Sequence, residues 1–536
     1  MYLIDQHTKG IMEECKSRAR DAGLKFDKES LEYIVTNRDL IELSPRLMIP
    51  TLYDYWVNDV EVLKGKGIYK LYPNNPYETV INSRPAISYY NDNNPDWLNI
   101  MIFYHVIAHI DFFQNNIFFK HTWNDDFVGQ ALADKRLIDS LRSEYGRWVD
   151  YVIEFSRCID NLVGYYDLLS ESKLQFNMQT SEKVEFYFGE FLQEINKVPE
   201  MLIFKDIERY NDLILEQGSL GETSFFAEVK LKYPEFQAKF EKYLEKPKPK
   251  NNDLMEFIIE NSSFLRKESN RWMISVINII RNTALYFSPQ SRTKIINEGW
   301  ASYWHDKLFR KDDRIKGHEV DYAIINAGVT SLSRVGLNPY AIGLRLIQYV
   351  EDLADKGKLD FNFQKINQYE IIENYNKNTH KGKEAIFELR SNFSDFMLLN
   401  TFITQEFVNL HDLFVVGQRI NEEHGTIEYY IKSRKSQDYK SMLLDKLQHP
   451  PKIFIDNKRT NEKNLYLVHQ FEGKQLIKDY ISDTMIGIEF LWGDQVQLET
   501  TEIYQIPPRS EDEEPKYENR RVLYTMKNKK IKKEFI

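Results

Sequence analysis

The sequence has few cysteines, glycines and prolines, and it has no long uninterrupted hydrophobic segment. Its 536 residues include 2 cysteines, 22 glycines and 17 prolines. Two cysteines, Cys15 and Cys158, are too few for a disulfide framework in a chain of this length. The longest apolar run, around residues 100–110, is interrupted by histidines and ends at Asp111, so it is too short and too polar to span a bilayer. With no apolar secretory stretch behind the first methionine, we expect a cytoplasmic protein without a transmembrane segment.

The chain also lacks an excess of positive charge. Lys and Arg number 71 against 81 Asp and Glu, which gives a formal net charge of −10 and a pI near 5.7. A protein that coats nucleic acid normally needs a basic surface to displace counterions from the phosphates. We therefore expect no nucleic-acid partner. A glycine-rich phosphate loop followed by lysine and a GxSxG segment are both absent from the sequence, so neither a P-loop nor a serine nucleophile elbow is indicated.

Apolar and aromatic residues at helical spacing are abundant. Hydrophobic residues make up 42% of the chain, which is enough to bury a sizeable core. They recur every three or four positions through residues 137–151, 152–168, 272–285 and 341–353, which predicts helices there. Pro289 predicts a break between one helix that ends near Phe287 and another that starts near Ser291. We expect residues 1–422 to form a large, mainly α domain.

After about residue 425 the pattern changes from helical to mixed. Strands are expected at 426–431, 452–455, 465–469 and 495–500, and helices at 436–447 and 475–492. This order, βαββαβ, predicts a small ferredoxin-like α+β module over residues 423–505. Residues 506–536 contain an acidic run and a lysine-rich end, which we expect to form a solvated, charged tail.

The segment HVIAHIDFFQNN, residues 105–116, carries the first group of candidate ligands. His105 and His109 are four residues apart, which places both imidazoles on one face of a helix, about one turn from each other. Both rings can then reach one metal ion, although such a pair alone is more often satisfied by hydrogen bonds in the core. Asn116 lies on the same stripe and could fix an imidazole tautomer. Asp111 lies beside the stripe and could serve a neighbouring ring nitrogen.

The segment NEGWASYWH, residues 297–305, carries the second group. Glu298 and His305 are two helical turns apart on one face, and the small Ser302 between them leaves room for another group to approach. Gly299 inside a helix costs about 1 kcal/mol relative to alanine, so it indicates close packing or a cap. Taken alone, this segment is better explained as an amphipathic helix with its aromatic side chains in the core and its glutamate in a salt bridge.

Together, the two segments predict a site for a divalent metal ion. The candidate ligands are His105, His109, Glu298 and, as a fourth, His305. The residues expected around these ligands are Asp111, Asn116, Ser302 and Tyr303. Three protein ligands with an open position are typical of catalytic zinc sites, and iron or manganese are the alternatives.

Several segments resemble the stage V sporulation protein R (SpoVR) family, in the same order and over almost the whole chain. They are YETVINSRP (77–85), HVIAHIDFFQNN (105–116), NEGWASYWH (297–305), GLNPYAIGL (336–344), FEGKQLIKDY (471–480) and LWGDQVQLET (491–500). The resemblance implies a cytoplasmic bacterial protein linked to sporulation, notably spore cortex formation, or to stationary-phase and stress responses. It also implies a connection with a PrkA-type serine kinase system.

The candidate ligands also resemble those of gluzincin metallopeptidases, in which a helical HExxH and a later NEG-like motif supply two histidines and a glutamate. The residue after the first histidine is Val106, where those peptidases carry the glutamate that activates water. A hydrolase without that base lacks a rate acceleration of roughly 100- to 10,000-fold. The resemblance therefore implies a metal-dependent hydrolase in which another group, Asp111 or Tyr303, serves as base, or a site that is not a peptidase.

The chain departs from the SpoVR pattern at two places. Residues 51–61 (TLYDYWVNDVE) replace an SHWSFGK-like stretch, and Asn326 stands where relatives often carry a histidine before a small-Gly-Val triplet. If that histidine lines the site, the chemistry of this chain is altered. Three hypotheses stay open: a metal-dependent hydrolase acting on an envelope-related or peptide-like substrate, a non-catalytic regulator or scaffold whose small module docks a partner, and an Fe(II) site for oxygen chemistry.

Overall fold

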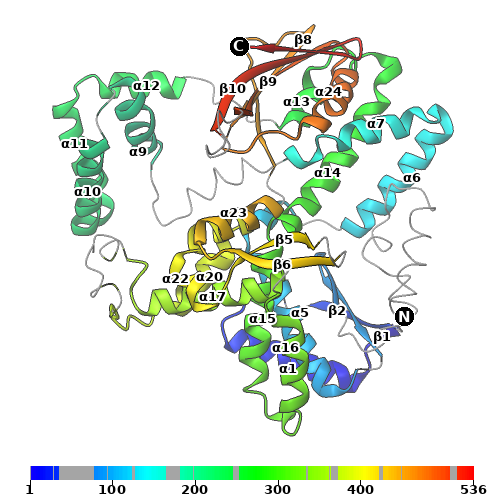
Figure 1. The fold of residues 1–536 in the computed structure, drawn as a ribbon, viewed down its shortest axis with the longest axis vertical. Helices are drawn as coiled ribbons and strands as arrows, with labels where there is room; N and C mark the ends of the chain where they lie inside the picture. The colour runs from blue at the N-terminus through cyan, green and yellow to red at the C-terminus, as the bar shows by residue number, and fades with distance from the viewer. Residues whose placement is uncertain are drawn as a thin grey trace. The chain divides into compact units, whose positions relative to one another are not determined.

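The computed structural model of the chain divides it into two compact units, Met1–Gly164 with Asp253–Ile536, and Tyr165–Asn252 (Figure 1). The structure describes residues 2–27, 29–35, 78–92, 94–122, 127–163, 181–196, 198, 200–245, 253–333, 336–360, 363, 372, 374–421, 426–447, 450–471, 473–506 and 516–536. The departure from the SpoVR pattern at residues 51–61 lies outside these ranges. The inserted unit was not anticipated from the sequence.

The first unit is built around helix α5 (Asp96–Asn115), which is buried on nearly all sides. A helix that is hydrophobic all round has to lie inside the protein. It packs against α1 (Gln6–Asp21), α15 (Lys294–Phe309) and α20 (Gly382–Asn392). Among the described residues, none of the helices combines the length and hydrophobicity that crossing a bilayer requires.

A four-stranded sheet near the N-terminus lies next to α5. Its strands are β1 (Tyr2–Leu3), β2 (Ser30–Val35), β3 (Glu78–Ile81) and β4 (Ala86–Asn91), in the order β1-β2-β4-β3. β2 and β4 run parallel, and the other neighbours are antiparallel. β3 and β4 both contact α5. This sheet leads the chain directly into the helix that carries the two candidate histidines.

The remaining helices of the mainly α part include the ones expected at 272–285 and 341–353, whereas the helices expected at 137–151 and 152–168 are divided differently, with a break at residues 146–147 and an end at Arg157. They are α6 (Phe127–Tyr145), α7 (Trp148–Arg157), α13 (Leu254–Asn261), α14 (Trp272–Arg292), α16 (Glu319–Thr330), α17 (Pro339–Asp355), α21 (Asp395–Phe402) and α22 (Gln405–Leu410), with short helical turns η1 (Ile117–Thr122), η2 (Asp160–Leu162), η5 (Glu268–Asn270) and η6 (Asp313–Ile315). The expected break at Pro289 is wrong, because α14 continues through the proline to Arg292. The break comes at Thr293, whose hydroxyl donates to the carbonyl of Pro289.

The second unit is a small helical body with an aromatic core. It consists of α9 (Glu182–Glu185), the π-helix η3 (Phe186–Ile195), α10 (Glu200–Gln217), the turn η4 (Gly218–Leu220), α11 (Gly221–Lys232) and α12 (Phe236–Glu245). Its core contains Phe186, Tyr187, Phe191, Phe225 and Phe236. Tyr187 contacts Phe236 edge to face at 5.3 Å between ring centres, a favoured arrangement of aromatic rings.

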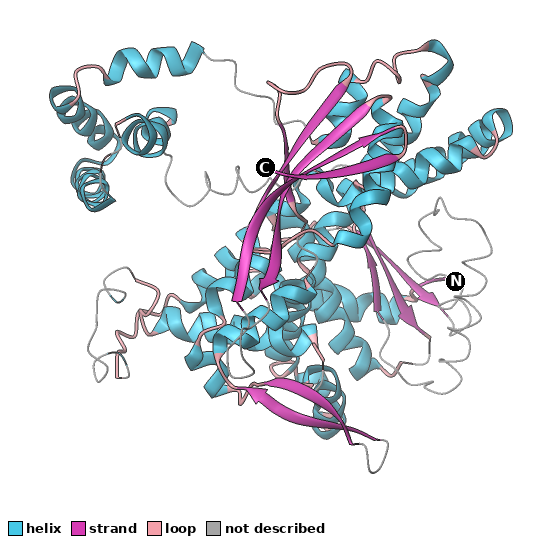
Figure 2. Ribbon diagram, turned by 45° about the horizontal axis from the view of Figure 1, so that its top comes forward, coloured by secondary structure: helices cyan, strands magenta, loops and turns pink. Residues whose placement is uncertain are grey.

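The C-terminal part confirms a mainly α domain followed by a small α+β module. After the hairpin of β5 (Val415–Asn421) and β6 (Thr426–Ser433) come α23 (Ser436–Lys446), β7 (Lys452–Ile455), β8 (Asn464–Gln470), α24 (Lys478–Trp492), β9 (Gln495–Ile506), β10 (Lys516–Lys527) and β11 (Lys530–Phe535). Figure 2 shows the last five strands as one sheet, in the order β11-β10-β9-β8-β7. β8 and β9 are parallel, joined by α24.

Two details of the module differ from the prediction. The first expected strand, β6, pairs only with β5 in a separate two-stranded sheet, so the ferredoxin-like order is not formed. The expected solvated tail instead supplies the last residue of β9, Ile506, and the strands β10 and β11, which begin at Lys516. Val522, Tyr524 and Met526 alternate along β10 and are buried, which places this strand in the core shared with α7, α14 and α24.

Two glycines set how closely α15 approaches α17. A methyl group on Gly299 would lie 2.3 Å from the backbone of Gly343, and one on Gly343 would lie 2.1 Å from the carbonyl oxygen of Ile295. Neither glycine has a positive φ, so space rather than backbone conformation requires them. The close packing predicted from Gly299 is therefore what the structure contains, and it fixes the position of the neighbouring Glu298.

Gly299→Ala is expected to lower the thermal unfolding midpoint, because the added methyl meets backbone atoms that cannot move aside. Overpacking of this kind costs about 1–3 kcal/mol. Gly10→Ala in α1 is the matched control, because a methyl group at that position would meet nothing within 4 Å. It should be neutral or stabilise by up to about 1 kcal/mol through helix propensity. Equal midpoints for the two variants would contradict the close contact.

Candidate metal centre

His105 and His109 from α5 face Glu298 from α15. Nε2 of His105 lies 3.8 Å from Oε2 of Glu298, and Nε2 of His109 lies 3.5 Å from the same oxygen. One ligand atom from each of the three residues lies within 4.8 Å of the others. The histidines are only 4% and 6% exposed. The fold thus brings together the two predicted ligand segments, although His109 and Glu298 are 189 residues apart in the sequence.

The other ring nitrogens are held by hydrogen bonds. Nδ1 of His109 is 2.9 Å from Oδ1 of Asn297, and Nδ1 of His105 is 2.8 Å from Nδ1 of His305. An amide oxygen only accepts, so His109 carries its proton on Nδ1 and leaves Nε2 as a lone pair. His305 places Nε2 3.0 Å from Oδ1 of Asn326, so its proton is on Nε2 and its Nδ1 accepts from His105. As neutral rings, both α5 histidines therefore direct the lone pair of Nε2 toward Glu298.

These donors fit a divalent cation. Two atoms bound about 2.1 Å from a tetrahedral zinc ion lie roughly 3.4 Å apart, close to the distances between the ring nitrogens and Glu298. Oε2 of Glu298 is buried, and no hydrogen-bond donor reaches it within the part of the chain that the structure describes. A buried carboxylate oxygen without such a donor is costly unless a cation is nearby. Neutral imidazoles and a carboxylate are ligands that zinc, iron and manganese accept.

His305 is close to the group but lies outside it. Its two ring nitrogens face His105 and Asn326, and it is not among the three residues that converge. This geometry gives it the role of orienting His105, a common function of residues behind a metal ligand. Asn326, the position where relatives often carry histidine, also donates to Oδ1 of Asp306 at 3.4 Å.

Asp111 was expected to serve a histidine ring nitrogen, but its carboxylate contacts other groups. Its carboxylate accepts from Trp300 Nε1 at 2.9 Å and from the backbone nitrogen of Lys25 at 2.6 Å, and it pairs with Arg390 at 3.3 Å. Burial raises the pKa of Asp111 to about 6, while Arg390 opposes that rise. The aspartate therefore ties α5 to α15, α20 and the segment after α1.

The other residues expected near the ligands lie in different surroundings. Asn116 donates to the carbonyls of Arg390 and Phe393, and so joins the end of α5 to α20. Ser302 is completely buried, and its hydroxyl has no hydrogen-bond partner among the described residues. Tyr303 donates to Glu351 at 2.7 Å, and both burial and this carboxylate raise its pKa. Neither Asp111 nor Tyr303 is placed as the base that replaces the missing glutamate.

Sequence reasoning did not single out three further residues. Asn297 holds His109, and its position directly before Glu298 was a usable signal. The ring of Tyr340 stacks on His105 with 6.1 Å between ring centres, and it belongs to the GLNPYAIGL segment. Asp395 accepts from the backbone nitrogens of Ile295 and Ile296, both at 2.9 Å, at the start of α15. Nothing in the local sequence around Asp395 indicates this contact.

Comparison with known proteins gives one family and one distant relative. The family model described as SpoVR like protein matches residues 5–450. The Escherichia coli (strain K12) protein called "Uncharacterized protein YcgB" is 23% identical over 339 residues, which covers 60% of this chain and 59% of that protein. The chain thus spans about three fifths of that relative's length. No solved structure shows significant similarity.

Purified protein made without a histidine tag is expected to bind about one zinc ion per chain. His109→Ala should abolish binding because it removes one of three ligands. His305→Ala should retain binding with affinity about 10–100-fold lower, because the lost group only orients a ligand. Metal content by mass spectrometry and chelator competition provide the measurement.

The exposed histidine His7, which contacts Asp96, supplies the control for this comparison. His7→Ala should leave zinc affinity unchanged. Complete loss of zinc in His305→Ala, equal to the loss in His109→Ala, would instead make His305 a direct ligand.

Asp395 gives the stability of the protein a defined pH dependence. Burial, with a contribution from Glu298, raises the pKa of this carboxyl to about 7, whereas an unfolded aspartate titrates near 3.9. The folded state therefore holds a proton that the unfolded state has lost, and the stability this provides is complete below about pH 4 and disappears as the pH rises to about 7.

Asp395→Asn stays neutral across that range. We expect the free energy of unfolding of the parent, relative to this variant, to fall by up to about 1.4 kcal/mol per pH unit between about pH 4 and 7. Urea unfolding of metal-free protein at several pH values measures the difference. Taking the difference cancels the titration of other groups such as Asp111, and parallel pH profiles for the two proteins would refute the assignment.

Proposed function

The chain belongs to the SpoVR family, and on this premise we propose that it is a metal-dependent enzyme of the hydrolase type. His105, His109 and Glu298 hold a divalent cation, zinc in the first place, with iron or manganese as alternatives. A cation bound there supplies Lewis acidity that polarises a substrate carbonyl and activates water. The observation that supports the proposal is the convergence of two ring nitrogens on a buried carboxylate oxygen that has no hydrogen-bond donor among the described residues.

The chain's own residues prepare this site before any ligand arrives. Asn297 and His305 keep the two ligand rings in the tautomer that offers Nε2. Glu298 contributes one negative charge and so partly neutralises the cation. Because both rings are almost completely buried, bulk water is excluded, and electrostatic interactions inside the site are stronger than in solution. The enclosure favours a small substrate, such as a short peptide or an envelope precursor, over a polymer.

The site lacks the base of HExxH peptidases. Val106 is completely buried, so its position faces the protein core. The carboxylate of Asp111 and the hydroxyl of Tyr303 are bonded to other groups. The proposed hydrolase therefore works without the rate acceleration of roughly 100- to 10,000-fold that such a base supplies. We expect its turnover to be slow for this reason.

The cellular role we propose rests on the family. It is a cytoplasmic function in spore cortex formation or in stationary-phase and stress responses, connected with a PrkA-type serine kinase system. Val106 favours a second candidate function, a non-catalytic regulator in which the metal stabilises the packing of α5 on α15. In that case the small C-terminal module docks the kinase system.

One experiment separates the two functions. Zinc-loaded protein is incubated with short peptides and soluble peptidoglycan stem-peptide fragments, and products are followed by mass spectrometry. We expect hydrolysis that falls at least 100-fold in Glu298→Gln, the order of effect expected when a catalytic group is lost. Glu384→Gln on the exposed side of α20 is the control and should keep full activity.

Absence of hydrolysis by the zinc-loaded parent would reject the enzyme. Equal binding of a purified PrkA-type kinase to the parent and to Glu298→Gln would then support the regulator.

A further inference from the structure

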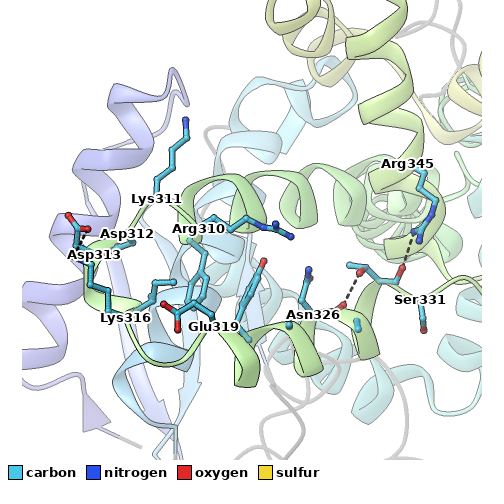
Figure 3. A pocket seen from close by; sticks show the side chains of 15 residues that line it. Arg310, Lys311, Asp312, Asp313, Lys316, Glu319, Asn326, Ser331 and Arg345 are labelled. Atoms are coloured by element: carbon cyan, nitrogen blue, oxygen red, sulfur yellow. Dashed lines mark hydrogen bonds and ion pairs between the residues drawn. The ribbon is translucent and has the colours of Figure 1, made fainter.

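A cavity of about 720 Å³ lies between the end of α15, the turn after it, α16 and α17. This volume is in the range of small-molecule binding sites. Figure 3 shows its lining, with Arg310 and Lys316 on one side and Ser331 and Arg345 on the other. The residues that converge on the candidate metal centre do not line it. Asn326 does, and the same side chain contacts His305.

Each acidic side chain of the lining already has a partner. Asp312 accepts from Arg314 at 2.9 Å and from Tyr104 at 2.7 Å. Asp313 pairs with Lys316 at 3.2 Å, and Glu319 accepts from the backbone nitrogen of Gly317 at 2.9 Å.

The basic residue Arg310 is neutralised in the same way. Its side chain pairs with Asp306 at 2.8 Å, the aspartate that also contacts Asn326.

Arg345 is different, because it is half-buried and no carboxylate pairs with it within the described part of the chain. Its Nη1 donates to the carbonyl oxygens of Thr330 and Ala341, at 2.9 and 3.0 Å. Burial lowers the pKa of Arg345, and no neighbouring carboxylate opposes that effect. A guanidinium offers five N–H donors in a planar fork, and these two contacts leave its second arm available. A half-buried cation of this kind is stabilised by an anion.

The part of the lining that α16 supplies leaves room for the rest of a ligand. Ala323 and Ala327 are four residues apart on α16, and both are exposed and small. Ser331 adds an exposed hydroxyl near Arg345 (Figure 3). A ligand with an oxyanion at one end and a compact body therefore matches this lining in charge and in shape.

We propose that this cavity binds a small molecule that carries a carboxylate or phosphate group, and that Arg345 is the residue that pairs with the anion. The inference does not depend on the enzymatic proposal, because the metal ligands lie outside the cavity. Asn326 lines the cavity and also contacts His305, which in turn contacts His105. A molecule bound in the cavity is therefore separated from His305 by the side chain of Asn326 alone.

The test is a calorimetric titration of the full-length protein with inorganic phosphate and with succinate, at constant ionic strength against a sodium chloride blank. We expect the parent to bind one of these anions at a ratio of about one per chain. Arg345→Gln should weaken that binding at least 10-fold, the loss expected for a charge-assisted hydrogen bond. Preference for phosphate or for succinate identifies which oxyanion the cavity takes.

Two further variants make the result decisive. Lys316→Gln removes the same charge from the same cavity and should change affinity less than about 3-fold, because Lys316 is exposed and paired with Asp313. Ala327→Trp fills the cavity from an exposed helix position and should abolish binding without removing any charge. It also serves as the test if Arg345→Gln does not fold.

His109→Ala should bind the anion as the parent does, which separates this site from the metal centre. The proposal is overturned if the parent binds neither anion above the chloride blank. It is also overturned if Lys316→Gln weakens binding as much as Arg345→Gln, or if Ala327→Trp leaves binding intact.

Discussion

The contact of Gly299 with Gly343 is the constraint on which the candidate site depends. Because neither residue has a side chain, α15 and α17 touch along their backbones, and α15 can press against α5 on its other side. Glu298 is next to the first of these glycines, so its carboxylate reaches the two histidines of α5. A glycine inside a helix costs about 1 kcal/mol in propensity. The glycine is nevertheless needed, because a side chain at this position would keep the two helices apart. The position of the Glu298 carboxylate follows from their close approach.

Buried acids hold α15 in this position. Asp395 accepts from the first backbone nitrogens of the helix, and Asp111 accepts from Trp300 one turn further along. Both carboxyl groups are raised in pKa by burial, to about 7 and about 6. A buried acid has to find hydrogen-bond donors, and here the donors belong to the helix that carries Glu298. Asp111, which the sequence offered as a candidate base, instead acts with Asp395 to hold α15, and so Glu298, in position.

The sequence predicts what is local and misses what is distant. Helical spacing places His105 with His109 on one face, and the structure confirms that face. The meeting of that face with Glu298 required the family resemblance, since no local pattern joins segments so far apart. Asp395 has no local signal at all, because its partners are backbone nitrogens. The last strand, β11, was missed because its side chains are exposed on both faces and rich in lysine, which is how edge strands avoid further pairing.

Asn326 bears on the choice between an enzyme and a regulator. A neutral histidine at this position could either accept a proton from His305 or donate one, so a chain of histidines can pass protons away from a metal site. The amide of an asparagine does not titrate. Its oxygen accepts from His305, which fixes the proton of that ring on Nε2 and the proton of His105 on Nδ1. The substitution therefore secures the metal-binding tautomer of His105, and it removes a path by which a proton could leave the site. If the proposed cation binds, this arrangement favours its coordination by Nε2 of His105 and disfavours proton transfer through residue 326.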